Sequence, residues 1–198
     1  MRSRRVLIPL GLVLAAGLTA ILAWFQPWKL WVDHRVDEKL PAVALAPAAP
    51  SPAAGSATSR ARQPAGASPS PRSSASTTAG PVLLSRGELI SHEHPTHGTV
   101  SVVRQPDGGL LLAIAHLDTS NGPDVHVWLT DAPVRPGSDG WHLFDDGAHV
   151  SLGTLKGNVG NQVYRIPSGV DLSRLTSVSI WCDRFDVSFG AAQLVPVH

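Results

Sequence analysis

The stretch Ser91–Val100, SHEHPTHGTV, holds three of the chain's nine histidines within six positions. His92 and Glu93 begin the H-E-x-x-H pattern of zinc proteases, in which two histidines one helical turn apart hold the metal. Thr96 stands where the second histidine should be, and Pro95 argues against a continuous helix. The residues therefore exclude a zinc protease of this type.

The same histidines have the chemistry of a different metal site. On an extended segment His92 and His94 point to one face, where two imidazoles can bind copper or zinc. A third ligand would come from His97, His116 or His126. We predict His92, His94 and His97 as a candidate metal site. The alternative is an exposed polar loop that leads into the first strong strand.

Cys182 is the only cysteine, so no disulfide can form within the chain, although one between two chains can. In the run SVSIWC, Val178, Ile180 and Cys182 alternate onto one apolar face of an expected strand. Such a cysteine is either a small buried hydrophobic residue or a reactive thiol whose pKa is lowered by nearby positive charge. Arg184 is the nearest cation in the sequence. These residues alone leave both interpretations open.

Other catalytic signatures are absent from the sequence. It contains no G-x-S-x-G, no P-loop, no G-x-G-x-x-G and no C-x-x-C. Residues 82–198 contain seven Lys and Arg but twelve Asp and Glu, whereas residues 1–81 contain nine Lys and Arg and three Asp and Glu. The acidic C-terminal part argues against a nucleic-acid partner.

The N-terminal segment has the pattern of a membrane anchor. Residues 6–25 carry no charge, and a helix over them would span about 30 Å at about 1.5 Å per residue, the thickness of a bilayer core. Arg2, Arg4 and Arg5 precede this run and place the N-terminus in the cytoplasm. We predict an uncleaved signal-anchor that crosses the cell membrane once and leaves the C-terminal domain extracytoplasmic. The alternative, a cleaved secretory signal, also exports the chain.

The composition of the chain predicts three segments. Residues 1–40 are the anchor and a juxtamembrane segment, in which the helix is expected to continue through WKLWVDHRVDEKL and stop before Pro41. Residues 41–81 are rich in Ala, Pro and Ser and predict a disordered linker, which would hold the next domain about 35 to 120 Å from the membrane. The linker's Ala, Pro and Arg bias is typical of a GC-rich bacterial source. Residues 82–198 are the folded domain.

Short apolar runs in residues 82–198 predict the fold class. TVSVVR, GLLLAIAH, DVHVWLT, SVSIWC and FDVSFG are separated by turn sequences such as PDGG and NGPD, and no long helical period is present. This pattern predicts an all-β domain, an antiparallel β-sandwich or barrel, preceded by one transmembrane helix and a disordered linker.

Three longer runs together resemble a known family. They are HPTHGTVSV, LDTSNGPDVHVWL and LGTLKGNVGNQVYRIPSGVDLSRLTSVSIWCDRFDVSFGAAQL. In this order they are similar to the DM-thirteen domain family, the "electron transfer" domain that in animal proteins often accompanies DOMON domains, over about residues 86–195. The resemblance implies an all-β domain proposed to take part in electron transfer.

The resemblance also implies candidate site residues. The family's single cysteine falls on Cys182, proposed as a redox thiol or as a ligand to a prosthetic group, with haem or a transition metal as candidates. The family's histidine falls on His94 and its glycine on Gly98, whereas His92 and His97 look like additions of this chain. Cys182 and His94 are therefore the candidate cofactor-binding residues.

Two functional hypotheses follow. The first is a membrane-anchored extracytoplasmic redox module, with Cys182 at its centre and an unknown redox partner. The second is a non-enzymatic surface binding module whose contacts include Asn121, Trp128, Trp141 and His142. Either one is a carrier or a binding module rather than a hydrolase or transferase, and either could bind metal through the histidine cluster.

Overall fold

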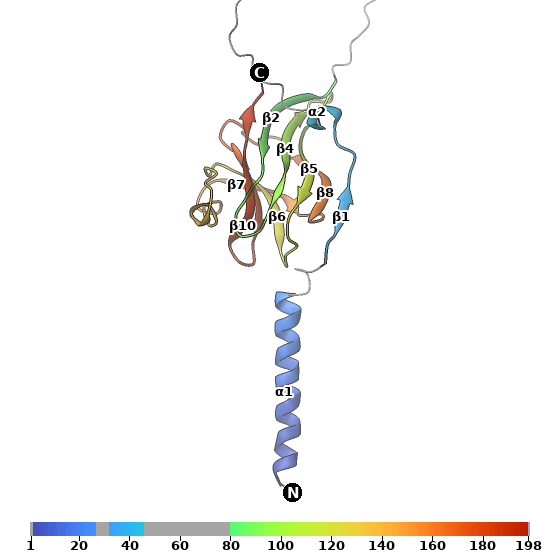
Figure 1. Cartoon of the computed structure of the whole chain (residues 1–198), viewed down its shortest axis with the longest axis vertical. Coiled ribbons are helices and arrows are strands. Elements are labelled where there is room, and N and C mark those ends of the chain that lie inside the picture. The colour runs from blue at the N-terminus through green and yellow to red at the C-terminus, as the bar shows by residue number, and fades with distance from the viewer. Residues whose placement is uncertain (1, 27–31, 46–79, 198) are drawn as a thin grey trace, which may run out of the picture.

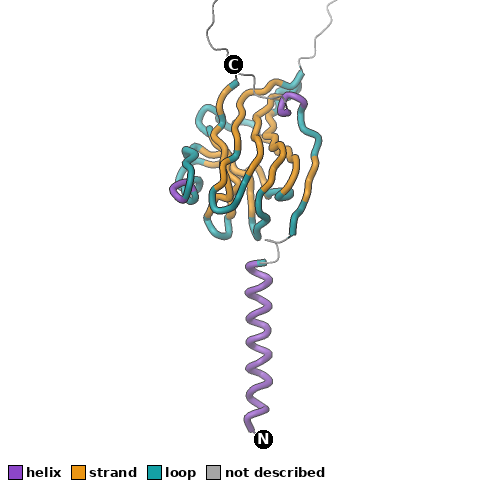
Figure 2. Tube along the Cα trace, in the orientation of Figure 1, coloured by secondary structure: helices purple, strands orange, loops and turns teal. Residues whose placement is uncertain are grey.

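The computed structural model of the chain describes residues 2–26, 32–45 and 80–197 (Figure 1). A long helix lies at one end, and a two-layered β domain follows it. Figure 2 shows that strands make up most of the domain, with loops at its two ends.

The β domain is a sandwich of two sheets. The six-stranded sheet contains, in spatial order, β1 (Arg35–Asp37), β8 (Val159–Ile166), β5 (Leu110–Asp118), β4 (His97–Arg104), β2 (Val82–Glu88) and β11 (Val195–Pro196). The five-stranded sheet contains β3 (Ile90–Ser91), β10 (Val187–Gln193), β9 (Ser177–Cys182), β6 (Val125–Thr130) and β7 (His149–Thr154). Every pairing is antiparallel except that of β1 with β8, so the predicted all-β antiparallel sandwich is confirmed.

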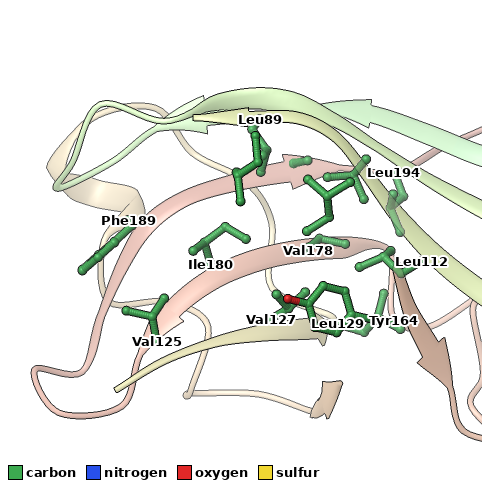
Figure 3. Packing of buried hydrophobic residues seen from close by; sticks show 14 of the residues in the cluster. Leu89, Leu112, Val125, Val127, Leu129, Tyr164, Val178, Ile180, Phe189 and Leu194 are labelled. Carbon is green, nitrogen blue, oxygen red and sulfur yellow. The ribbon is translucent and has the colours of Figure 1, made fainter. Parts of the chain in front are cut away.

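The core lies between the two sheets, where alternate side chains of each strand meet (Figure 3). Val127 and Ile180 of the five-stranded sheet and Leu112 of the six-stranded sheet are completely buried there. The alternation predicted for β6 and β9 is therefore observed. β9 is buried on both faces, because Phe144 in the loop between β6 and β7 packs over its outer face at Trp181.

The long helix α1 (Arg2–Phe25) covers the apolar N-terminal run. It ends at Phe25, because the positive φ of 45° at Gln26 departs from the helical conformation. Among the described residues, no helix combines the length and the apolarity that a membrane crossing needs. The membrane anchor therefore stays a prediction.

The predicted continuation of the helix to residue 40 is wrong. β1 instead runs parallel to the edge of β8, with Arg35 opposite Val159. The backbone of His34 binds the Asn158 side chain at 2.7 Å, and the Glu38 amide donates to the Asn161 carbonyl at 2.9 Å. The open edge of β8 thus supplies partners that a helix in this segment could not use.

Residues 35–45, which we call the strap, continue from β1 into the short helix α2 (Ala42–Leu45). Leu40 and Ala44 are buried against Val103 and Ala113 on the outer face of the six-stranded sheet. The strap therefore belongs to the β domain in the structure, although its sequence predicts the end of a helix and the start of a linker.

Part of the predicted linker, residues 41–81, belongs to the described β domain. Residues 46–79 lie outside the described residues, but the chain on either side of them is packed on the same domain, with Pro41 and Pro81 lining one cavity. Residues 42–45, predicted as the start of the linker, instead form α2 on the β domain, whereas the linker residues 46–79 stay outside the described part of the chain.

Candidate functional site

Cys182 is the last residue of β9 and faces the core. Its side chain is fully buried, and its cross-strand neighbours are Val125 on β6 and Val187 on β10. The strand ends directly after it, in a turn where the Phe185 amide donates to the Cys182 carbonyl at 3.2 Å. Cys182 is thus buried, yet the residue that follows it, Asp183, is exposed at the surface.

The surroundings of the sulfur act on its pKa in opposite directions. Burial raises the pKa of the Cys182 thiol, because a thiolate loses its hydration in the core. The nearby backbone amides of Arg184, Phe185 and Asp124 favour the thiolate and offset part of this effect. The net pKa is above the ordinary value, so Cys182 is a protonated thiol at neutral pH.

The cation that the sequence placed near Cys182 lies elsewhere. The Arg184 guanidinium is stacked 4.5 Å over the ring of Trp24 and donates to the Trp24 carbonyl at 2.9 Å. It therefore links the β domain to the end of α1. The positive charge expected to lower the pKa of the thiol is engaged in that contact.

The three histidines of the opening stretch are not brought together. β3 ends at Ser91 in the five-stranded sheet and β4 begins at His97 in the six-stranded sheet, so the chain crosses between sheets over residues 92–96. His94 packs edge-on against Phe189 at 4.1 Å, whereas His97 is exposed. Among the described residues, one group of ligand atoms lies close enough together to hold a metal ion, and it includes none of these three histidines. The predicted extended geometry fails because the segment bends.

His92 has a structural environment of its own. It is buried, its Nδ1 lies 2.9 Å from Ser188 Oγ, and its Nε2 lies 3.0 Å from the Arg135 carbonyl oxygen. A carbonyl oxygen only accepts, so Nε2 carries the proton and donates. The ring also stacks on Phe144 at 5.8 Å. Both ring nitrogens are engaged, and His92 supports the loop between β6 and β7.

This burial predicts a pH-dependent stability. Burial lowers the pKa of His92 from its ordinary value of 6.5, and the bond to the Arg135 carbonyl opposes this only in part. Below pH 6.5 His92 becomes protonated in the unfolded chain but stays neutral in the folded chain. The free energy of unfolding therefore falls as pH falls from 6.5 towards the folded pKa, by up to about 1.4 kcal/mol per pH unit. Denaturant unfolding between pH 8 and pH 5 measures this slope.

The variant His92→Gln isolates the contribution of that one ring, because it keeps a donor and an acceptor but does not titrate. We expect a shallower loss of stability below pH 6.5 in this variant. Equal slopes in the two proteins would show that other groups cause the acid sensitivity.

Cys182 and His94 do not fit a haem between them. The Cys182 side chain is enclosed by close-packed core residues, and the His94 ring lies against Phe189. A cavity of about 550 Å³ exists beside the strap, but Leu40, Leu111 and Val163 line it, and neither candidate ligand does. A macrocycle at the sulfur would require the two sheets to separate.

The NGPD turn before β6 has a packing role, as its glycine and proline predict. A Cβ at Gly122 would lie 2.6 Å from Val125 Cγ2 and 3.0 Å from Phe189 Cζ, so only glycine fits there. Asp124 at the end of the turn accepts a bond from the Asp183 amide at 3.0 Å through its carbonyl. The turn thus fixes the start of β6 against the end of β9.

This junction places together three side chains that the sequence analysis did not combine. His126 Nε2 lies 3.0 Å from Asp124 Oδ1 and 3.6 Å from Asp183 Oδ2. Burial raises the pKa of Asp183, and the negative charges of Asp124 and Asp186 add to this, while His126 opposes it. The D-V-H alternation puts Asp124 and His126 on one face, but only the pairing of β6 with β9 brings Asp183 to them.

The contacts expected of a surface binding module are largely engaged within the structure. Trp128 is buried, stacked between His149 at 4.0 Å and Trp181 at 5.1 Å. The Asn121 amide donates to the Val32 carbonyl at 3.3 Å, and His142 Nδ1 lies 2.6 Å from the Asp186 carbonyl oxygen. Trp141, also expected among these contacts, is half-buried and packs against the core. Trp128 in particular is a packing residue.

The fold and this site define an all-β sandwich with a single buried cysteine at the end of an inner strand. The family described as Electron transfer DM13 matches residues 88–194, more than half of the 198-residue chain. The chain belongs to this family, as the sequence resemblance predicts, and the family description indicates a redox-related module. Comparisons with curated proteins and with solved structures found no match.

Proposed function

We propose that this chain is an extracytoplasmic electron-transfer module, held at the cell membrane by its N-terminal helix, with Cys182 as the redox-active residue. The family description supports the redox role. The observation that carries the role of Cys182 is its place as the last residue of β9, directly before the surface turn, where the backbone amides of Arg184, Phe185 and Asp124 act to lower the pKa of its thiol. Such donors stabilise negative charge that develops on sulfur.

Burial determines which redox chemistry this thiol can perform. Thiol–disulfide exchange needs direct access of an attacking thiolate to the sulfur, and Cys182 is fully buried. Electron transfer to an oxidised partner docked at the surface does not need such access. The thiol gives one electron to that partner and releases its proton, and the reverse reaction restores the thiol. Because one proton leaves with one electron, the potential falls by about 59 mV per pH unit.

The proposed membrane location places this residue well for a membrane-borne partner. Arg184, two residues after Cys182, contacts Trp24 near the end of α1, and Asn121 contacts Val32 just beyond that helix. These contacts put the strand end with Cys182 on the side of the domain next to α1. Figure 1 shows α1 at one end of the domain. If α1 is the anchor, this side faces the membrane surface.

The test is voltammetry of the full chain and of Cys182→Ala over a range of pH. We expect a one-electron couple in the natural protein, with the pH dependence given above, and no couple in Cys182→Ala. The variant Val178→Ser is the matched control. It disturbs the same buried face of β9 but keeps the thiol, so it should keep the couple. A couple that persists in Cys182→Ala would overturn the role of Cys182.

The second candidate is the non-enzymatic binding module, in which Cys182 is only a packing residue. The complete burial of its side chain and its raised pKa favour this function. The same voltammetry decides between them. A natural protein with no couple at any pH would support the binding module and contradict the electron-transfer proposal.

A further inference from the structure

We propose that Asp124, His126 and Asp183 form a binding site for one divalent transition-metal ion of the zinc class. The site is independent of the redox role of Cys182. It also differs from the histidine cluster that the sequence suggested, since only carboxylates and one imidazole from the β6 and β9 ends contribute.

The register of the five-stranded sheet creates the site. Val125 pairs with Cys182 and His126 pairs with Trp181, and both Val125 and Cys182 point into the core. The residues on either side of this inward pair must therefore point outward. Asp124, His126 and Asp183 consequently share the outer face at one end of the sheet. The bond from the Asp183 amide to the Asp124 carbonyl, at 3.0 Å, fixes the two strand ends against each other.

The distances between ligand atoms suit a small divalent ion. One ligand atom from each of the three residues lies within 4.8 Å of the other two. The imidazole Nε2 is 3.0 Å from one carboxylate oxygen and 3.6 Å from the other. Zinc bonds to nitrogen and oxygen are about 2.0–2.2 Å, which places tetrahedral ligands about 3.3–3.6 Å apart. Small side-chain rotations therefore suffice for an ion to enter.

The carboxylates at this site are close enough together that a bound cation would stabilise them. Val125 and Cys182 are directly opposite each other in the antiparallel pair of β6 and β9, so Asp124 and Asp183, one position further along, also face each other. Like charges opposite each other destabilise a sheet. Asp186 adds a third carboxylate in the turn that follows β9. His126 is the residue that both Asp124 and Asp183 approach, and it offers one charge at most. A divalent ion would neutralise the two carboxylates and coordinate the imidazole at once.

The kind of ligand and the exposure define the class of ion. One nitrogen and two oxygens suit zinc and similar borderline ions better than calcium, which takes oxygen ligands only. The side chains of Asp124 and Asp183 are each 41% exposed, and that of His126 is 21% exposed. Solvent can therefore reach the ion, and water would complete three protein ligands to four, an arrangement of exchangeable rather than permanently closed sites.

The test is zinc titration of the full chain, purified without an affinity tag and freed of metal with a chelator. Calorimetry should give one zinc ion per chain at this site. Asp183→Asn keeps the shape of the side chain but removes its charge, and should weaken binding by more than about tenfold. Asp186→Asn is the matched control: it removes a nearby negative charge but no ligand atom, so it should weaken binding much less than Asp183→Asn does. Asparagine tolerates the positive φ of 49° at that position.

Further variants keep the result decisive. Asp124→Asn should weaken zinc binding as Asp183→Asn does, and thermal unfolding without metal shows that each variant is folded. Cobalt in place of zinc should give the same visible spectrum in the natural protein and in Cys182→Ala, since the sulfur is not a ligand. Absence of zinc binding, or equal affinity in the natural protein, Asp183→Asn and Asp124→Asn, would overturn the site. Either result leaves the voltammetry of Cys182 unaffected, so the two proposals fail separately.

Discussion

Gly160→Ala is expected to detach the strap, residues 35–45, from the six-stranded sheet. Gly160 lies on β8 with a φ of 111°, and an added Cβ would collide with the Val36 carbonyl of β1. Because β1 pairs with β8 at this point, the collision is with backbone and cannot be relieved by a side-chain rotation. The strand pairing and the burial of Leu40 would be lost, and that burial alone is worth about 1.5–3 kcal/mol.

Hydrogen exchange of the full chain measures this detachment. The Glu38 amide, bonded to the Asn161 carbonyl at 2.9 Å, reports directly on the strap, and we expect its exchange to accelerate by about tenfold or more. The ion pair of Glu38 with Lys156, at 2.8 Å, should be lost with it. Amides in the centre of β9 should change much less, since the strap packs on the other sheet.

Gly153→Ala is a close control for this experiment. Gly153 has a similar φ of 122°, but an added Cβ there would meet open space. The two variants thus share the backbone strain and differ in the contact with β1. If exchange of the strap amides accelerates equally in both, or in neither, the docking of the strap does not depend on the fit at Gly160.

Gln162→Leu is expected to lower the free energy of unfolding by about 3 kcal/mol. Gln162 is fully buried on β8, where its amide donates to the Gly157 carbonyl at 2.5 Å. Its carbonyl accepts from the Tyr164 hydroxyl at 2.7 Å and from the Lys156 amide at 3.1 Å. Burial raises the pKa of Tyr164 to about 12, so this hydroxyl stays a donor at all ordinary pH values.

The expected loss has a specific cause. Leucine fills a similar volume but leaves the Gly157 carbonyl without its amide donor and the Tyr164 hydroxyl without its closest acceptor. An unsatisfied buried polar group costs about 1–3 kcal/mol. Urea unfolding measures the change. Arg165→Leu is the control on the same strand, because Arg165 is exposed and its change should stay within about 0.5 kcal/mol. A Gln162→Leu protein as stable as the control would show that the loop holds without this network.

This network also explains the LKGNVGNQVY run that carries part of the family resemblance. Gly157 allows the His34 backbone to approach, Gly160 allows that of Val36, and Gln162 ties the loop to β8. These positions shape the edge on which the strap docks. Their pattern is therefore explained by structure, without a role in chemistry.

Local alternation in the sequence determined the strands and their faces. Val178, Ile180 and Cys182 could be assigned to the core because side chains on a strand alternate with period two, whatever the strand pairs with. The turn sequences NGPD and PDGG marked strand ends for the same local reason, since glycine and proline restrict the backbone around them. The all-β class and the inward position of Cys182 follow from these patterns alone, whereas the choice between a sandwich and a barrel does not.

The tertiary structure decided the features that depend on partners far away in the chain. Residues 28–40 are compatible with a helix locally, but the edge of β8, more than a hundred residues later, makes Arg35–Asp37 a strand. His92 and His94 were expected on one extended face, yet residues 92–96 cross between the two sheets and separate them. The cluster of Asp124, His126 and Asp183 exists because Val125 pairs with Cys182. A pairing register between distant strands is set by how the whole core packs, and no local pattern specifies it.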